Sequence, residues 1–550
     1  MMLLTGAFAA NGRQIKSYPD VEKVTVFTDR SLYITGEKVQ FSAFIRSVFQ
    51  QEPPLSVILY VEIVSPDGKS IAREKFSVKN YFAEGDLSVP KDIITGIYYL
   101  RAYTKYKRNA GPEAYSYVAL KIVNPFRNDV VQGSDTAVTS MAESNHTDYA
   151  DTFVISADKK EYKPREVVNV SIIAKDIRPG DVQGLCISVI PEASSSENML
   201  QLPVRDSRVT SLRYYPENRG VSLTGELKEN ASGKAIGGAR VNLSIIGKGR
   251  EFMAMQTDSS GRYFFTLPDY TGRRDLFLSA ANTLNSHPEI IIDNDFCTEP
   301  VQLPSPIFKL SAEEYAATYK MALNARLWEI FAPDTIPCKD HVEISDGAFY
   351  GKPSATLVID KYIQLPTLED YFFELPTFVK VRKRHGEKYL KVIGSQAEMT
   401  FFDPLIMIDW VAIDDPAKIL AILPQDVERI EFVYEPYVKG DVTYGGIVSI
   451  ISKRGDFAGI DLPASGRFIN FRFLTEESIC QKNEPAIANI PDVRNTLFWE
   501  PSLELNATDG AQITFTTPDT PGRYLIVLNG VTRDGNKVTF KKEFDVSQEK

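Results

Sequence analysis

The chain has 550 residues, a formal net charge of −10 at pH 7 and an isoelectric point near 5.3. A chain of this length exceeds what one hydrophobic core can organise, so we expect roughly three to five domains. The acidic balance argues against a nucleic-acid-binding protein, because no basic excess is available to neutralise phosphates.

Residues 1–10, MMLLTGAFAA, form a short apolar run that ends in small residues, as a secretory signal does before its cleavage site. The usual basic start is missing, so the run is interpreted as a possible signal-peptide remnant. No other stretch approaches the ~18–20 apolar residues that cross a bilayer. We expect an exported protein without a transmembrane segment, periplasmic or associated with the outer membrane.

Short β-branched and aromatic runs, separated by Pro, Gly and Asp-Gly turns, predict a mainly β, multidomain fold of immunoglobulin-like sandwiches with one small α/β domain. The predicted blocks are a sandwich at 21–125, a linker at 126–152, a second sandwich at 153–205, a third at 221–283, a helix at 311–331, the α/β domain at 354–456 and an immunoglobulin-like segment at 494–548.

The first block carries the most specific pattern. The turn 66–68 (PDG) follows the strand-like run 57–64 and predicts a hairpin. The segment 28–41 (TDRSLYITGEKVQF), followed by 59–62 and 96–104, resembles an MG2 domain of the alpha-2-macroglobulin family, as carried by many Bacteroidetes envelope proteins. The resemblance implies a macroglobulin-like β-sandwich.

Two further sandwiches are predicted by resemblance. The opening pattern of the first block returns at 158–170 (DKKEYKPREVVNV), with Arg165 where the macroglobulin family usually has glycine. Segments 224–227, 233–243 and 257–265 resemble a carboxypeptidase-regulatory-like domain. That resemblance implies a small accessory sandwich with no chemistry of its own.

The run 311–331 predicts the clearest helix of the chain. Ser311 and Glu314 have the spacing of a capping box. The large apolar residues recur at helical spacing, which predicts a face that packs in a core. That face comprises Tyr315, Tyr319, Ala322, Leu323, Leu327 and Ile330.

The α/β block resembles the plug domain of TonB-dependent outer-membrane receptors. A buried strand is expected at 404–411, a short helix after Asp415, and two more strands at 426–433 and 444–455. Fewer than about 100 residues follow, too few for the transmembrane barrel of such a receptor, so we expect a plug-like domain without a barrel. The last block resembles a macroglobulin-family segment with an immunoglobulin-like finish.

The sequence predicts no enzyme, and neither a cofactor nor a metal. The four cysteines lack the Gly-Cys-Gly-Glu-Gln setting of the macroglobulin thioester; they are either buried thiols or disulfides with three possible connectivities. The four histidines are scattered, and no metallohydrolase, nucleophile-elbow or phosphate-loop motif is present. The cysteines are Cys186, Cys297, Cys338 and Cys480, and the histidines are His146, His287, His341 and His385.

Two polar runs have open interpretations. The triplet 293–295 (DND) is either a polar loop or part of a calcium site. The basic run 380–388 (KVRKRHGEK) is either a solvated hairpin tip or a surface for an anionic partner.

The preferred hypothesis is a non-catalytic protein that binds or scaffolds a protein partner at the outer membrane. Alternatives are a non-covalent macroglobulin-like protease inhibitor, with 127–152 as its bait segment, and an enzyme built from loops. The oligomeric state stays open. The candidate partner-binding residues lie in the plug-like block, where they form either an exposed surface or the lining of an internal sheet. They are Tyr434, Tyr437, Lys439 and Tyr444.

Overall fold

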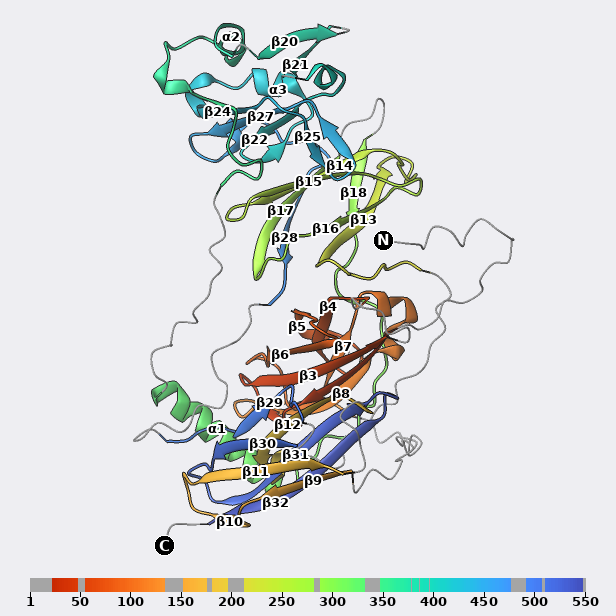
Figure 1. Ribbon diagram of the computed structural model, residues 1–550, viewed down its shortest axis with the longest axis vertical. Helices are drawn as coiled ribbons and strands as arrows, with labels where there is room; N and C mark the ends of the chain where they lie inside the picture. The colour runs from red at the N-terminus through yellow and green to blue at the C-terminus, as the bar shows by residue number, and fades with distance from the viewer. Residues whose placement is uncertain are drawn as a thin grey trace, which may run out of the picture. The chain divides into compact units, whose positions relative to one another are not determined.

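The computed structural model shows a mainly β protein with several sheets, as predicted (Figure 1). It divides into two compact units: Met1–Gly220, Phe296–Lys339 and Leu474–Lys550 form unit 1, and Val221–Asp295 and Asp340–Phe473 form unit 2. The structure describes residues 22–47, 55–133, 152–175, 181–195, 212–280, 287–331, 347–376, 378–384, 386–394, 396–475, 491–506 and 510–547. The possible signal remnant 1–10, most of the predicted bait segment, Cys338 and Cys480 lie outside these ranges.

The first sandwich of unit 1 packs a three-stranded sheet on a five-stranded one. Val26, Phe41, Val61 and Leu120 are buried between the two sheets, and the predicted hairpin joins β4 to β5. The first sheet has the order β1 (Glu22–Thr28), β3 (Lys38–Ser47), β6 (Phe82–Ser88), and the second β2 (Leu32–Ile34), β8 (Ser116–Val123), β7 (Gly96–Tyr103), β4 (Ile58–Val64), β5 (Ser70–Ser77).

The second sandwich of unit 1 combines two distant parts of the sequence. The predicted blocks 153–205 and 494–548 form one sandwich rather than two domains, because each supplies strands to both sheets and neither can close a core alone. The sheets are β10 (Glu161–Tyr162), β32 (Lys537–Val546), β31 (Gly522–Thr532), β12 (Val182–Pro191), β29 (Phe498–Glu500), and β30 (Ala511–Thr516), β11 (Val167–Ala174), β9 (Phe153–Ala157).

Helix α1 (Ala312–Phe331) begins with the predicted capping box. The Glu314 N–H donates to Ser311 Oγ at 3.1 Å, and the Ser311 N–H donates to Glu314 Oε2 at 2.9 Å. The predicted buried face is wrong for its large residues Tyr315, Tyr319, Leu323 and Ile330, which are exposed, whereas Ala322 packs as predicted. The helix instead packs its small residues and Met321 on β2, since alanines allow a closer approach than tyrosines. The packed set is Met321, Ala317, Ala322, Ala325, Leu32 and Ile34.

Unit 2 begins with a sandwich of seven strands. The predicted block 221–283 is extended by β18 and by β28, which the chain adds after the α/β region. The sheets are β16 (Arg262–Thr266), β13 (Ser222–Glu229), β18 (Pro288–Ile292), and β15 (Glu251–Gln256), β14 (Arg240–Ile246), β17 (Arg273–Ala280), β28 (Arg467–Arg472).

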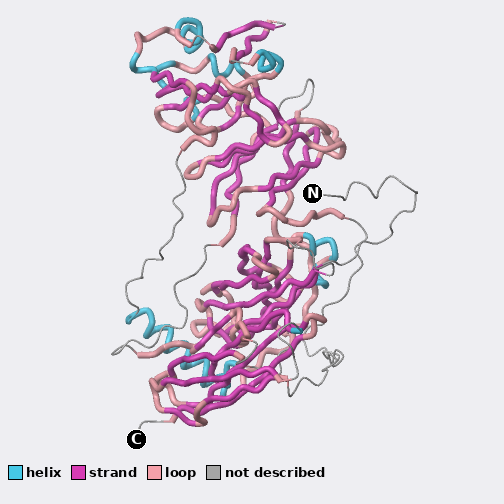
Figure 2. The backbone as a smooth tube through the Cα atoms, in the orientation of Figure 1, coloured by secondary structure: helices cyan, strands magenta, loops and turns pink. Residues whose placement is uncertain are grey.

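The rest of unit 2 is a mixed α/β body around one central sheet; Figure 2 draws its helices in cyan and its strands in magenta. Asp415 caps α3 and Pro416 occupies its first turn, as predicted. The sheet has the order β19 (Ala355–Val358), β24 (Val427–Val433), β27 (Ile447–Ser452), β22 (Leu405–Ile408), β23 (Val411–Ala412); the helices are α2 (Leu368–Glu374) and α3 (Pro416–Leu420), and two hairpins join β20 (Val379–Arg384) to β21 (Glu387–Val392) and β25 (Tyr437–Lys439) to β26 (Val442–Tyr444).

Candidate functional site

Three of the four predicted partner-binding residues lie on the small β25–β26 hairpin. Tyr437 pairs with Tyr444 and Lys439 with Val442 across the two strands. Tyr434 lies just before the hairpin, at the end of β24. The structure therefore places three of the predicted residues on one hairpin, but the four side chains have different surroundings.

Tyr444 is buried, with 2% of its surface exposed. Its ring lies 6.1 Å from that of Phe252, and the guanidinium of Arg240 lies 5.6 Å from its centroid. Phe349 lies 5.7 Å from Phe252 and 5.8 Å from Tyr437, which makes a shared aromatic cluster. Burial raises the pKa of both tyrosine hydroxyls. Tyr444 is thus a core residue and not part of an exposed surface.

Lys439 also makes an internal contact. Its Nζ lies 2.6 Å from Glu251 Oε1 on β15, and both side chains are partly buried. Together with the aromatic cluster, this ion pair holds the β25–β26 hairpin to the sandwich of unit 2. Of the four predicted residues, Tyr434 lies apart: its half-buried ring is 4.9 Å from the exposed ring of Phe378.

The basic run 380–388 forms the β20–β21 hairpin, as the sequence predicts for that stretch. Arg382 and Lys383 are exposed near its tip. His385 lies outside the described residues. The hairpin packs one face on α2 and α3, through Val379, Leu390 and Val392.

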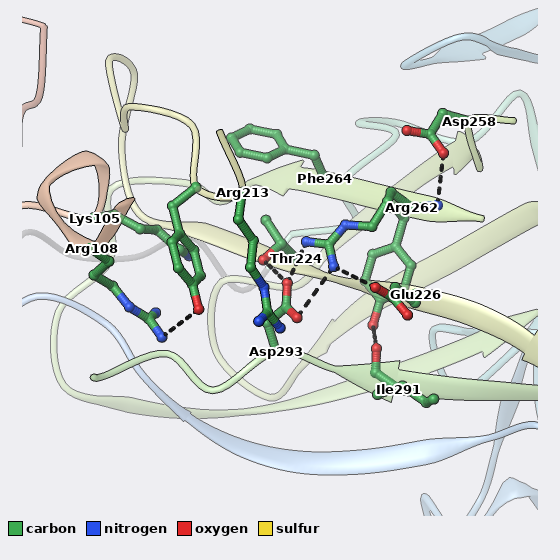
Figure 3. Close-up of polar contacts among 12 residues, drawn as sticks. Lys105, Arg108, Arg213, Thr224, Glu226, Asp258, Arg262, Phe264, Ile291 and Asp293 are labelled. Atoms are coloured by element: carbon green, nitrogen blue, oxygen red, sulfur yellow. Dashed lines mark hydrogen bonds and ion pairs between the residues drawn. The ribbon is translucent and has the colours of Figure 1, made fainter. Parts of the chain in front are cut away.

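The triplet 293–295 does not form a calcium site, because the side chain of Arg262 lies beside the Asp293 carboxylate. Figure 3 shows Arg262 between two carboxylates: its Nη2 lies 2.6 Å from Asp293 Oδ2, and its Nη1 3.1 Å from Glu226 Oε1. Thr224 Oγ1 donates to the same Asp293 oxygen at 2.7 Å. The Asp293 carboxylate is therefore neutralised by a side chain of its own sheet. Within the described ranges, no group of three or more acidic, His or Cys residues could hold a metal ion.

Buried charges on the first sandwich are the feature that the sequence prediction missed. Glu62 and Arg101 are fully buried on neighbouring strands, with Arg101 Nη2 2.8 Å from Glu62 Oε1. The Tyr103 hydroxyl donates to the same oxygen at 2.6 Å, and Arg101 donates to the Cys297 carbonyl at 3.0 Å. Burial opposes the charge on Arg101, but attraction to Glu62 outweighs it and raises its pKa. A charged residue inside an otherwise apolar strand is the signal that could have indicated this cluster.

A second buried pair holds the segment that leads from unit 1 toward residue 220. Lys105 Nζ lies 3.7 Å from Glu217 Oε1, and the Tyr60 hydroxyl donates to Glu217 at 3.1 Å. Arg108 (Figure 3) donates to the hydroxyl of Tyr214 at 3.1 Å. The outer face of the β4–β7 sheet thus anchors 212–217 and, through Cys297, the segment that begins at residue 296. These charges are structural, because each stabilises a chain segment that crosses the sheet.

The described cysteines are two free, buried thiols, Cys186 and Cys297. Burial raises the pKa of the Cys186 thiol, which leaves little of the reactive thiolate at neutral pH. Helices in the described part of the chain are too short or too polar to span a membrane.

Residues 23–119 match the family model of the MG2 domain, which confirms the macroglobulin-like interpretation of the first sandwich. Similar solved structures include Salmonella alpha-2-macroglobulin reacted with methylamine, with 11% identity, a TM-score of 0.24, and 97% of this chain but 40% of that chain covered. Trypsin-activated alpha-2-macroglobulin from Escherichia coli has 10% identity, a TM-score of 0.24, and coverage of 98% and 42%. Latent PorU from Porphyromonas gingivalis has 12% identity, a TM-score of 0.15, and coverage of 50% and 34%.

The chain spans about two fifths of the length of the macroglobulins with which it aligns. At such identities and TM-scores these structures carry no information on activity. No curated protein matches the sequence.

Proposed function

We propose that this chain, with an MG2 domain at residues 23–119, is a non-catalytic, exported cell-envelope protein that binds or scaffolds a protein partner. The MG2 match carries the proposal, because we expect a β-sandwich module to act through its surface loops. The charged clusters support it: Glu62, Arg101 and Asp293 are each paired within the fold, as structural rather than reactive groups.

The partner of this chain is the second part of the proposed function. We place it at the outer membrane, on a transport or secretion assembly that the α/β region 354–456 docks on. The resemblance of this region to a receptor plug supports that role. It makes the partner a membrane-embedded protein and not a small molecule.

Affinity purification from detergent-solubilised outer membranes tests this function. The tagged full chain should recover a membrane protein in a stable complex, and a chain deleted for 354–456 should not. Recovery of free monomer alone, under mild detergent and from cells that express the chain at its natural level, contradicts the proposal.

The alternative is a macroglobulin-like protease inhibitor that acts without a thioester, and the same MG2 match favours it. This function requires a protease to cut the chain within 127–152 and to be inhibited as a result. Incubation with trypsin, with residual activity measured on a large protein substrate, separates the two functions. Cleavage without inhibition excludes the alternative and leaves the scaffold proposal unaffected.

A further inference from the structure

The β20–β21 hairpin has one covered face and one outer face, which its register defines. Val379 pairs with Val392 and Val381 with Leu390, and these side chains pack into the core with α2 and α3. Directly opposed residues share a face, and successive residues alternate between faces. The outer face therefore consists of Phe378, Lys380, Arg382, Tyr389, Lys391 and Ile393.

The outer face changes character from its base to its tip. At the base, Phe378 and Ile393 are joined by a backbone hydrogen bond of 2.7 Å, and their side chains are 47% and 39% exposed. Lys391 donates to the Phe402 carbonyl at 2.8 Å, so the exposed Phe402 lies beside this base. Toward the tip, Arg382 follows about 13 Å farther along the strand, at about 3.3 Å per residue.

The pairing of charges on this hairpin breaks an ordinary rule of sheets. Lys380 lies directly opposite Lys391, and Lys383 directly opposite Lys388. Like charges in such positions destabilise a strand pair. Lys388 and Lys391 have acidic neighbours in Glu369 and Asp403, whereas Lys380 and Arg382 make no ion pair with any described residue.

The acidic neighbours compensate only one lysine of each opposed pair. A local rule that is broken without full compensation inside the fold is a sign of function. The chain as a whole is acidic, with a net charge of −10, so the basic outer face is a local reversal of its charge. The charge that would compensate Lys380 and Arg382 is negative. The exposed Phe378 and Ile393 on the same face offer an apolar contact beside it.

We propose that the outer face of the β20–β21 hairpin binds an acidic segment of a partner protein that also carries aromatic or aliphatic side chains. The apolar residues of the segment contact Phe378 and Ile393, and its carboxylates pair with Lys380 and Arg382. A segment of about four extended residues spans the distance between the two parts. This inference deepens the proposed scaffold function and rests on it.

The arrangement favours a peptide over a membrane surface. A bilayer contacts the most protruding side chains and needs the apolar ones there, with cations behind them. Here the order is opposite: the cations lie toward the tip, and the apolar residues lie at the base of the hairpin.

Fluorescence anisotropy with the full chain tests the proposal. The probe is a labelled synthetic peptide of about twelve residues in which Glu and Asp alternate with Leu and Phe. K380E/R382E should weaken its binding about tenfold or more, since opposite-charge contacts become repulsive. The matched control K309E/K320E reverses two exposed lysines of unit 1 and should leave binding unchanged. R382E alone changes only an exposed side chain and serves if the double variant fails to fold.

Equal binding by K380E/R382E and the control variant overturns the proposal. So does binding of the same peptide with Ser in place of every acid, or hairpin-dependent flotation of the chain with phosphatidylglycerol vesicles. If the chain dimerises and K380E/R382E abolishes the dimer, the outer face binds a second copy of the chain, and the proposal is overturned. If the membrane partner still co-purifies with K380E/R382E, the scaffold function stands and only the hairpin assignment fails.

Discussion

The same turn is built twice in this chain, once in the interior and once at the surface. The inner turn, 29–37, follows β1, the first strand of the first sandwich, and the outer turn, 158–166, follows β9, the first strand of the second. In both, a tyrosine hydroxyl binds the leading aspartate and a glutamate carboxylate receives a backbone N–H. The distances are 2.7 Å from Tyr33 to Asp29, 2.6 Å from Tyr162 to Asp158, and 2.7 Å from the N–H groups of Ile34 and Lys163 to Glu37 and Glu166.

The two turns differ in what covers them. Asp29 is 2% exposed, and Thr496 donates to its second oxygen at 2.5 Å, whereas Asp158 is exposed. Burial raises the pKa of Asp29. The hydrogen bond from Tyr162 lowers the pKa of Asp158, where little burial opposes it. The comparison teaches that the same hydrogen bonds fix the shape of both turns, while burial of the aspartate decides whether its pKa is raised or lowered.

Loss of the tyrosine hydroxyl should show the largest difference between the turns. Y33F leaves a buried carboxylate with one hydrogen bond fewer, so we expect it to destabilise the chain by about 2–3 kcal/mol. Y162F should cost about 1 kcal/mol or less, because water can replace the hydroxyl at the exposed Asp158. Urea unfolding followed by tryptophan fluorescence measures both. Equal losses would show that the cover of the inner turn has no energetic role.

The second-largest expected difference in stability concerns the residue of each turn that has a positive φ. Gly36 has φ +90°, outside the region that side chains tolerate, and Arg165 has φ +57°, inside it. G36A should therefore destabilise by about 1–2 kcal/mol. R165G should cost about 1 kcal/mol or less. Relief of the left-handed backbone is offset by the greater freedom of glycine when unfolded, and the lost ion pair with Asp519 is a surface pair of small worth. Thermal unfolding of the two variants checks the order, and a larger loss for R165G contradicts it.

The sequence predicted this repeated turn because the hydrogen bonds that shape it, from the tyrosine to the aspartate and from a backbone N–H to the glutamate, join residues three or four positions apart. The same locality explains the success of the Ser311 capping box and of the Asp415 cap. Arg165 stands where the macroglobulin family usually has glycine, and the arginine adopts the left-handed conformation itself.

Long-range features could not be predicted in this way. Nothing local in β11 or β30 shows that they pair across more than 300 residues, so one sandwich was divided into two blocks. In α1, Tyr315 and Tyr319 have the spacing of a core face, yet the partner strand β2 packs against Met321 and the alanines of the helix. For the candidate site, aromatic residues beside Lys439 suggested a surface, but Glu251 lies 188 residues away and makes the contact internal.

The smallest effect is a difference in pH dependence between D29N and D158N. The pKa of Asp29 is higher in the folded chain than in the unfolded chain, where it is about 3.9. Its contribution to stability is therefore complete below about pH 3.9 and is lost as the pH rises through the folded pKa. The lowered pKa of Asp158 gives stability above about pH 3.9 that disappears as the pH falls through its folded value. Relative to the unchanged chain, D29N should thus recover stability from about pH 4 upward, and D158N should recover it below that pH. Urea unfolding between about pH 3 and 7 measures both slopes; two slopes of the same sign would mean that burial does not decide the charge of the inner turn.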